Sequence, residues 1–395
     1  MQNEAGPGPD TTGPAPEPAG APGGAATTAW AVIAGGGTAG HTLPGIAIGR
    51  ALVARGHDPA TIHFVGSERG SESRLVPAAG FSVTLLPGRG IQRKLTLANV
   101  GAVWGLLKAV AHAFAMLRRH RPAVVVAMGG YASIPCAIAA IVLRIPIVVA
   151  EQNAVPGAAN RLTARFAKAA AVSFPGTDLP RAVLTGNPVR PEVLAVDRDR
   201  DRAGAREALS IADGQTVLLA FGGSLGSLRI NEAVVGALAS WRPRRELTVR
   251  HVIGERDWAA LSERAPAPVV EGVTYVSVRY EDDMPRAFAA ADLVLSRSGA
   301  TTVAELGAIG VPAILVPLPG APGDHQTANA RALVDAGAAV LVPDAELTAD
   351  RLVREVDALV AEPGRLEAMG RAARTTARRD AGDAVAALVE EHARG

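Results

Sequence analysis

Cysteine is almost absent from this 395-residue sequence, in which Cys136 is the only one. A single cysteine excludes an intramolecular disulfide and argues against a cysteine-based metal site, which fits a reducing compartment. Aromatic residues make up only 4%, and no nucleic-acid-binding motif accompanies them, so a nucleic-acid-binding protein is disfavoured. The first basic residue is Arg50, so a classical signal peptide is not expected.

Long uncharged runs are also rare. Residues 123–143 carry no charge and have the length of a transmembrane helix. Gly129, Gly130 and Pro135 interrupt this run, which instead predicts a strand at 124–128, a glycine turn, a buried helix at 135–143 and a strand at 145–150. Because fully buried parallel strands are continuously apolar, we expect no membrane-spanning segment in the chain.

Length and composition predict the domain organisation. Residues 1–29 are mostly Pro, Gly and Ala and are expected to be a disordered tail. The remaining length favours two domains, with a boundary near residues 188–192, ahead of a polar stretch at 198–206. We therefore expect a first domain at 30–188, a second at 189–372, and a C-terminal helix at 373–395 that packs back on the first.

Acidic residues are scarce in the first domain. Residues 30–188 hold 16 Lys or Arg and 5 Asp or Glu, whereas residues 189–395 hold 24 Arg and 30 Asp or Glu. This asymmetry indicates an anionic partner for the first domain, such as nucleic acid, a phosphorylated substrate or a membrane surface; ordinary surface charge is the alternative. Residues 88–97 mix basic and apolar side chains without a core period and are the candidate membrane loop. The helix that follows is expected to face the core, with a basic outer face.

A glycine-rich turn follows the first strand. Residues 30–34 predict a strand and residues 43–55 a helix, and between them Gly35, Gly37 and Gly40 satisfy the GxGxxG spacing of dinucleotide sites. No acidic residue closes the second strand, 61–65, which disfavours an NAD-linked oxidoreductase. His41 lies in the first turn of the helix, where it can act as a base or hydrogen-bond donor; a helix-capping histidine is the structural alternative.

A similar arrangement recurs in the second half. Strand 217–221 leads to a phosphate-style turn at 222–227, and strand 293–295 leads to a turn and a helix that ends at Gly310. A helix N-terminus favours an anion, and Glu305, one turn in, can take the hydroxyls of a ribose or remain solvated. Two such series predict two Rossmann-like domains facing a cleft, with a ligand at each switch point.

Six motifs in order resemble the MurG family of bacterial glycosyltransferases over residues 30–388: GGGTAGH at 35–41, MGGY at 128–131, EQNAVPG at 151–157, TGNPVR at 185–190, FGGSLGS at 221–227, and SRSGATTVAEL with DHQTANA at 296–306 and 324–330. The resemblance implies an α/β fold of GT-B type, with two doubly wound Rossmann-like domains facing a deep cleft. It also implies inverting transfer of N-acetylglucosamine (GlcNAc) from UDP-GlcNAc to the 4-hydroxyl of the N-acetylmuramic acid (MurNAc) unit in undecaprenyl-pyrophosphoryl-MurNAc-pentapeptide. A UDP-GlcNAc epimerase-type enzyme of similar fold is the alternative.

The resemblance also implies roles for residues, motif by motif. The donor would be bound by Thr38, Ala39, Gly40, Asn153, Arg190, Ser224, Glu281, Ala300, Thr301, Thr302, Val303, Ala304, Glu305, Gln326 and Asn329. Glu305 would hold the ribose, Ser224 and Arg190 the pyrophosphate, and Glu281 the uracil through its main chain. The acceptor side would contain Tyr131, His41, Glu151 and Asn160.

The implied chemistry needs a base and a stabilised leaving group. His41 is the leading candidate for the base and Glu151 the second, with Asn160 beside them. No cofactor and no metal ion are implied, and Asp282-Asp283 is expected to cap a helix. The lipid-linked acceptor implies a peripheral position at the anionic cytoplasmic face of the membrane. Leu225 and Ser227 depart from the family, whose members often carry Gln and Ala there.

Overall fold

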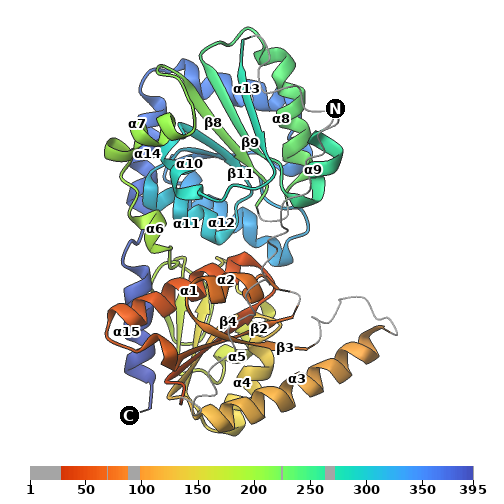
Figure 1. Ribbon diagram of the computed structural model, residues 1–395, viewed down its shortest axis with the longest axis vertical. Helices are drawn as coiled ribbons and strands as arrows, with labels where there is room; N and C mark the ends of the chain where they lie inside the picture. The colour runs from red at the N-terminus through yellow and green to blue at the C-terminus, as the bar shows by residue number, and fades with distance from the viewer. Residues whose placement is uncertain (1–27, 69, 88–97, 224–225, 263–271, 395) are drawn as a thin grey trace, which may run out of the picture.

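Two α/β lobes, one above the other, form the protein (Figure 1). The computed structural model describes residues 28–68, 70–87, 98–223, 226–262 and 272–394. Most of the predicted tail, the candidate membrane loop at 88–97, and Ser224 with Leu225 lie outside the described residues. Each lobe is built on one parallel sheet covered by helices on both faces, as the sequence predicts for a doubly wound fold.

The first lobe contains a seven-stranded sheet in the order β3-β2-β1-β4-β5-β6-β7. Its strands are β1 (Ala31–Gly36), β2 (Ile62–Ser67), β3 (Ser82–Leu86), β4 (Val124–Gly130), β5 (Ile147–Glu151), β6 (Ala169–Val172) and β7 (Ala182–Leu184). Both faces are buried, because Ile33 packs into one core and Val32 into the other. The strand order reverses between β1 and β4, and such switch points are where ligands bind in open sheets.

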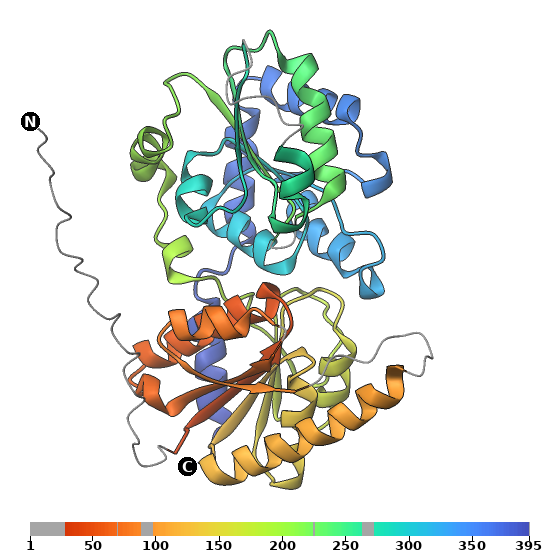
Figure 2. The same cartoon turned by 45° about the vertical axis from the view of Figure 1, so that its right-hand side comes forward.

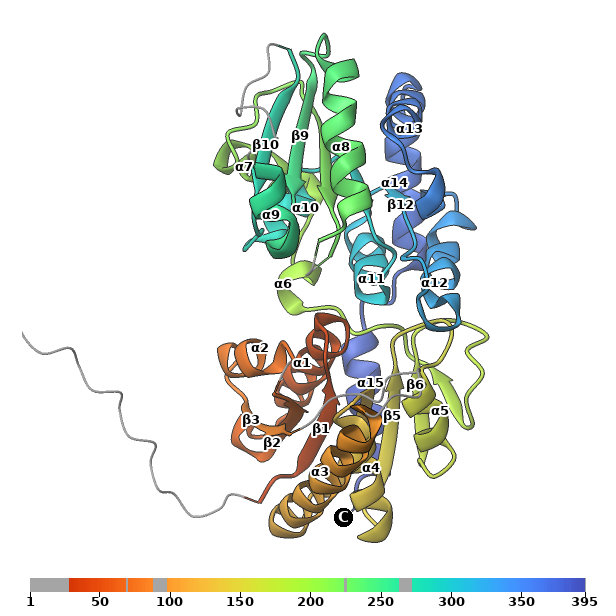
Figure 3. The ribbon, with the colours of Figure 1, turned by 90° about the vertical axis from the view of Figure 1, so that its right-hand side faces the viewer.

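Helices cover both faces of this sheet, with α1 and α2 on one side and α4 and α5 on the other (Figure 3). The helices of the first lobe are α1 (Ala39–Ala54), α2 (Glu72–Ala78), α3 (Ala98–His120), α4 (Ser133–Val142) and α5 (Ala158–Ala164). Helix α1 starts four residues earlier than predicted, which places His41 well inside its first turn. Pro44 lies in the second turn of α1, where its ring removes one backbone N–H donor from the helix.

The second lobe repeats the pattern, with a six-stranded sheet in the order β10-β9-β8-β11-β12-β13. Its strands are β8 (Thr216–Phe221), β9 (Leu247–Val252), β10 (Thr274–Val278), β11 (Leu293–Ser296), β12 (Ala313–Leu315) and β13 (Ala339–Leu341). Its helices are α8 (Leu228–Trp241), α9 (Glu255–Ser262), α10 (Met284–Ala290), α11 (Ala300–Ile309), α12 (His325–Val334), α13 (Ala349–Ala361) and α14 (Arg365–Thr376). Asp283 caps α10 and Gly310 ends α11 in the left-handed conformation, which confirms both sequence predictions.

The chain crosses between the lobes twice. The first crossing carries α6 (Pro191–Leu194) and α7 (Arg198–Ala208); the latter is the polar stretch at 198–206, which forms a helix packed on α10. The second crossing follows Thr376 and leads to α15 (Ala381–His392), which lies in the first lobe (Figure 2). There Val385 and Val389 are fully buried in the core beneath α1.

Candidate active site

Helix α11 begins directly after β11, at the switch point of the second sheet. Glu305 lies one turn into this helix and is only 6% exposed. Its Oε1 accepts hydrogen bonds from Arg190 Nη2 at 3.0 Å and Arg190 Nε at 3.3 Å. Burial raises the pKa of the Glu305 carboxyl above its ordinary value, and the charge of Arg190 opposes that change. The pair therefore presents an acceptor for hydroxyls and a cation side by side.

The first turn of α11 supplies further polar groups. The Thr301 hydroxyl is buried and has no hydrogen-bond partner among the described residues, while Thr302 is half-buried and Ala300 is buried. The first N–H groups of a helix have no intrahelical acceptor. This end of α11 can therefore receive an anion and hydrogen-bond it.

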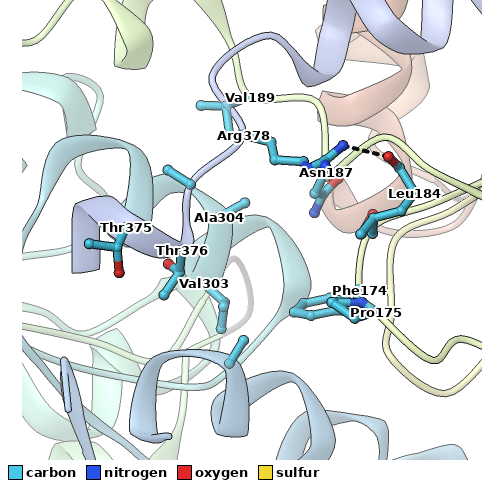
Figure 4. Close-up of a pocket in the computed structure, with 14 residues that line it drawn as sticks. Phe174, Pro175, Leu184, Asn187, Val189, Val303, Ala304, Thr375, Thr376 and Arg378 are labelled. Carbon is cyan, nitrogen blue, oxygen red and sulfur yellow. Dashed lines mark hydrogen bonds between the residues drawn. The ribbon is translucent and has the colours of Figure 1, made fainter. Parts of the chain in front are cut away.

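Val303 and Ala304 follow Thr302 in α11. Their side chains line a cavity of about 330 Å³ between the lobes, at the two crossings of the chain. Figure 4 shows Phe174 and Asn187 across this cavity from α11 and the end of α14. Asn187 is 6% exposed, and its amide has no partner in the described part of the chain.

Helix α12 joins the second lobe to the first. Asn329 Oδ1 accepts from Ala154 N at 2.8 Å, and Asn329 Nδ2 donates to Asn153 Oδ1 at 3.1 Å. The same Nδ2 lies 3.3 Å from Ser298 O, in the turn before α11. Gln326, also expected to contact the donor, accepts from Leu318 N through its Oε1. Asn329 thus connects the loop after β5 with the turn that leads to Glu305.

Glu281 is held by its own lobe. Its carboxylate forms an ion pair with Arg250 and accepts from Asp283 N at 3.3 Å. The side chain of Glu281 is therefore engaged within the second lobe.

His41 projects from the first turn of α1, at the switch point of the first sheet. Thr38, the residue before the helix, places its Oγ1 3.3 Å from His41 Nδ1. Ala39 and Gly40 lie between them, and Gly40 is exposed. Burial lowers the pKa of His41 below its ordinary value, while the nearby carboxylates of Glu151 and Glu72 oppose that change. A neutral imidazole at this position can accept a proton.

Asn160 lies beside His41 at the glycine turn that ends β4. A Cβ on Gly129 would lie 3.2 Å from Asn160 Nδ2 and 3.3 Å from His41 Nε2, and Gly129 has a φ of +94°. Only glycine therefore lets these two side chains approach the same point of the backbone. Asn160 is 1% exposed, and its Oδ1 has no partner among the described residues.

Glu151, at the end of β5, acts as a hydrogen-bond acceptor on both oxygens. Oε1 accepts from Asn153 N at 2.9 Å and Asn153 Nδ2 at 3.2 Å. Oε2 accepts from Gly157 N at 3.0 Å and Asn160 Nδ2 at 2.9 Å. Four donors therefore converge on one buried carboxylate, which fixes the loop that carries Asn153.

Tyr131 follows β4 and donates its hydroxyl to Pro87 O at 2.9 Å. Burial raises the pKa of this phenol, and the charge of Glu68 adds to the effect. The structure therefore brings His41, Glu151 and Asn160 together, and it places Tyr131 at the neighbouring end of β3, where residue 87 leads into the loop 88–97.

One buried group near His41 has no counterpart in the sequence predictions. The carboxylate of Glu72 accepts from Gly37 N and Thr42 Oγ1. The sequence shows an acid at this position, but no pattern relates it to a turn 35 residues earlier. Gly37 N–H, which would meet a dinucleotide pyrophosphate, is occupied by this carboxylate, which further disfavours an NAD site in the first lobe.

Two family models and many curated relatives match this chain. Residues 31–172 match the glycosyltransferase family 28 N-terminal domain, and residues 217–385 match the glycosyltransferase family 28 C-terminal domain. A relative from Alkalilimnicola ehrlichii, the UDP-N-acetylglucosamine--N-acetylmuramyl-(pentapeptide) pyrophosphoryl-undecaprenol N-acetylglucosamine transferase, is 43% identical over 92% of this chain and 99% of its own length. A relative of the same description from Streptomyces coelicolor is 40% identical over 91% of this chain and 97% of its own length.

Solved structures of related proteins resemble this chain over most of its length. The crystal structure of Acinetobacter baumannii MurG superposes with a TM-score of 0.69 at 30% identity, covering 91% of this chain and 98% of that one. UDP-GlcNAc 2-epimerase from Neisseria meningitidis has a TM-score of 0.62 at 14% identity, covering 91% and 99% of the two chains, and shares the fold alone. With both domains matched in order and 43% identity across nearly the whole length, this chain belongs to the MurG family of glycosyltransferases.

Proposed function

We propose that this protein transfers GlcNAc from UDP-GlcNAc to the 4-hydroxyl of MurNAc in undecaprenyl-pyrophosphoryl-MurNAc-pentapeptide, a step of peptidoglycan synthesis. The observation that carries the proposal is the hydrogen bonding of Asn329 to Asn153 and Ala154. It joins the base-bearing end of the first sheet to the Glu305 turn of the second. A donor held by one lobe can then meet an acceptor held by the other, as a transfer between two substrates requires.

The second lobe is suited to the donor. Glu305 would accept the two ribose hydroxyls, because its carboxylate is buried and anchored by Arg190. The N-terminus of α11 and the Thr301 hydroxyl would meet the diphosphate, and Ser224, Gln326 and the main chain of Glu281 would complete the site. Arg190 and the helix N-terminus would neutralise the charge that grows on UDP as it leaves, so this mechanism needs no metal ion.

The first lobe is suited to the acceptor. His41 would take the proton of the 4-hydroxyl as that oxygen attacks the anomeric carbon and the bond to UDP breaks, which inverts the configuration. Nδ1 of His41 contacts Thr38 Oγ1, so Nε2 is the nitrogen that faces Gly129 and the acceptor side. Glu151 is better suited to stabilise the imidazolium than to act as the base, because N–H donors engage both of its oxygens.

The first lobe also carries the features of a membrane-docking surface. Seven exposed apolar side chains lie on or next to the helices that cover one face of its sheet: Trp104, Leu107, Ile138, Ile141, Val142, Leu162 and Phe166. We call this set the apolar face. Basic residues accompany it on the same segments, among them Lys108 and Arg165. Apolar and basic side chains together favour binding to an anionic leaflet, which would place the protein at the cytoplasmic face of the membrane.

Membrane contact of this kind is peripheral in our proposal. None of the helices in the described ranges is both long enough and apolar enough to cross a bilayer. The prediction that α3 turns its apolar residues to the core is only half right. Ala109, Ala113 and Leu117 are buried, but Trp104 is 61% exposed and Leu107 is 56% exposed. These two side chains therefore extend the candidate membrane surface beyond the loop at 88–97.

The decisive experiment measures transfer of radiolabel from UDP-GlcNAc to a lipid-linked MurNAc-pentapeptide acceptor, with and without EDTA. We expect label in the lipid fraction at equal rates in both samples, because Arg190 and α11 replace a metal ion. Release of product from UDP-GlcNAc without any acceptor would instead support an epimerase. A strict requirement for magnesium would contradict the mechanism proposed for the leaving group.

A further inference from the structure

A buried carboxylate lies beneath the first glycine turn. Glu72, the first residue of α2, is 2% exposed. Its Oε1 accepts from Gly37 N at 3.0 Å and from Thr42 Oγ1 at 2.7 Å, and its Oε2 lies 3.4 Å from Ser67 N. Gly37 and Thr42 flank the segment that carries His41. One carboxylate oxygen therefore ties down both ends of that segment.

Glycines make the space for this side chain. A Cβ on Gly70 would lie 1.8 Å from Glu72 Oε2, and a Cβ on Gly66 would lie 2.6 Å from Glu72 Cβ. A Cβ on Gly36 would lie 3.3 Å from Oε2, which is tight. Backbone from β1, β2 and the loop before α2 thus encloses the carboxylate. Burying a charge is costly unless hydrogen bonds compensate it. In this fold, three glycines make room for the Glu72 side chain and three donors point at its carboxylate.

The charge of Glu72 also acts on His41. Three titratable groups face this imidazole: Glu72 from α2, Glu151 from the end of β5, and His325 from α12. Burial lowers the pKa of His41, the two carboxylates raise it, and His325 lowers it. A negative charge beside a base stabilises the cation that forms when the base takes a proton.

We propose that Glu72 is a positioning residue for the transfer reaction, which holds Gly37 and Thr42 so that His41 projects toward the acceptor. The proposal rests on the proposed role of His41 as the base. Glu72 acts through the backbone turn and through its charge, without touching a substrate. This role differs from that of Glu151, whose donors come from the loop after β5 and from α5.

Replacing Glu72 by Gln in the full chain tests the charge and the geometry together. Glutamine keeps the volume of the side chain but replaces one carboxylate oxygen with an NH₂ group. The side chain then has one acceptor fewer for the groups of Gly37, Thr42 and Ser67 that donate to it. We expect kcat to fall by roughly tenfold or more while KM for UDP-GlcNAc changes by less than about twofold, since Glu305, Arg190 and the N-terminus of α11 would supply most donor contacts from outside the segment that Glu72 holds. The titration of His41, followed by NMR, should move to lower pH.

Two further variants separate the effects. Glu72→Asp keeps the charge but shortens the reach, so kcat should fall while the His41 titration stays closer to that of the parent. Thr42→Val removes one donor and leaves the carboxylate in place, so it tests the contact in a protein whose buried charge is unchanged. Asp58→Asn is the matched control, because Asp58 is an exposed carboxylate in the same lobe, ahead of β2.

The NMR titration needs no turnover, so it distinguishes failure of this proposal from failure of the proposed function. If the parent protein transfers no GlcNAc but Glu72→Gln still shifts the His41 titration, only the function is wrong. If Glu72→Gln leaves kcat and the His41 titration at parent values, the positioning role is wrong. The same holds if activity falls only in proportion to the loss of folded protein while the titration does not move.

Discussion

His41 combines the position and the environment of a general base at one residue. It stands at a helix N-terminus, contacts Thr38 through Nδ1, and has two carboxylates nearby. Burial would by itself suppress protonation, and the carboxylates restore part of the proton affinity. The balance keeps the imidazole neutral at physiological pH and still able to take a proton in the transition state.

Replacing His41 by Ala should lower kcat by roughly 100-fold or more, the range typical for loss of a general base. Affinity for UDP-GlcNAc, measured by calorimetry, should stay near the parent value. A proposed base is inactive when protonated, and the pKa of His41 is lowered from 6.5, so the acid limb of the parent's kcat profile should have its midpoint below 6.5. An acid limb that persists in His41→Ala would show that another group is the base, with Glu151 the next candidate.

The burial that suits Glu305 to its proposed role in donor binding costs stability. Because burial raises its folded pKa, the ionised carboxylate is less favourable in the folded protein than in the unfolded chain. This cost is absent at low pH and appears as pH rises through the folded pKa. Arg190 offsets part of it, and a ribose diol would offset more.

Glu305→Gln should therefore leave the melting temperature of the free protein at pH 8 unchanged or raise it. UDP-GlcNAc affinity should fall by roughly tenfold to 100-fold, because hydrogen bonds to a charged acceptor contribute about 1.5–3 kcal/mol. Calorimetric scans from pH 5 to 8 and titration with UDP-GlcNAc measure the two effects. A lower melting temperature with unchanged donor affinity would make Glu305 a structural residue.

The sequence predicts which single residues lie near the carboxyl ends of strands. Glu151 ends β5, whereas His41 and Glu305 lie in the helices that follow β1 and β11. The structure places His41 near Glu151 and pairs Glu305 with Arg190. The sequence predicts poorly any contact that depends on the path between strands. Glu72 accepts a hydrogen bond from Gly37, 35 residues earlier in the chain. The hydrogen bonds to Glu151 depend on how the following loop folds, and the periodicity of the sequence does not predict that.

At the scale of elements, apolar runs and the residues that cap helices or form turns locate the strands and helices within a few positions. Gly310 and Asp283 mark helix ends as expected, because capping depends on local chemistry. The sequence does not predict that the polar stretch at 198–206 forms a helix, because ion pairs stabilise this helix. Arg202 and Arg206 both bind Asp292, whose carboxylate also accepts from Val217 N. Polar periodicity of this kind gives little apolar signal.

Helix α15 packs in the first lobe, although it follows the second lobe in the sequence. Its Val385 and Val389 are fully buried against the core of the first lobe, and Arg55 of the first lobe forms ion pairs with Asp383 and Glu390. The first lobe therefore completes its core only after the second lobe has been synthesised. Stability of the two lobes is linked through this helix.

Changing Val385 and Val389 to Ala should destabilise the first lobe by about 2 kcal/mol for each substitution, from lost burial and the cavities left behind. Glu391→Ala on the exposed side of α15 is the matched control. Hydrogen exchange should show faster exchange in β4 and β5 of the double variant, with α8 and α13 less affected. Equal loss of protection in both lobes would mean that they unfold as one unit.

At the scale of the whole molecule, the two lobes differ in charge and in exposed apolar surface. Basic residues dominate the first lobe and acidic residues the second, and the apolar face lies wholly on the first, where α3 runs along the outside (Figure 1). An anionic surface would therefore attract the first lobe and repel the second. The protein would dock with its acceptor lobe toward the lipid and its donor lobe toward the water from which UDP-GlcNAc arrives.

Replacing Trp104 and Leu107 by Glu should weaken binding to vesicles that contain anionic lipid, because both the apolar contact and the charge balance are lost. Each basic residue near such a surface contributes about 1 kcal/mol, so parent binding should also fall as salt rises. Leu228→Glu, an exposed leucine of the second lobe, is the matched control and should sediment with vesicles as the parent does. UDP-GlcNAc affinity should be the same in all three proteins. Equal sedimentation of the double variant and the parent would remove α3 from the docking surface and leave the loop at 88–97 as the remaining candidate.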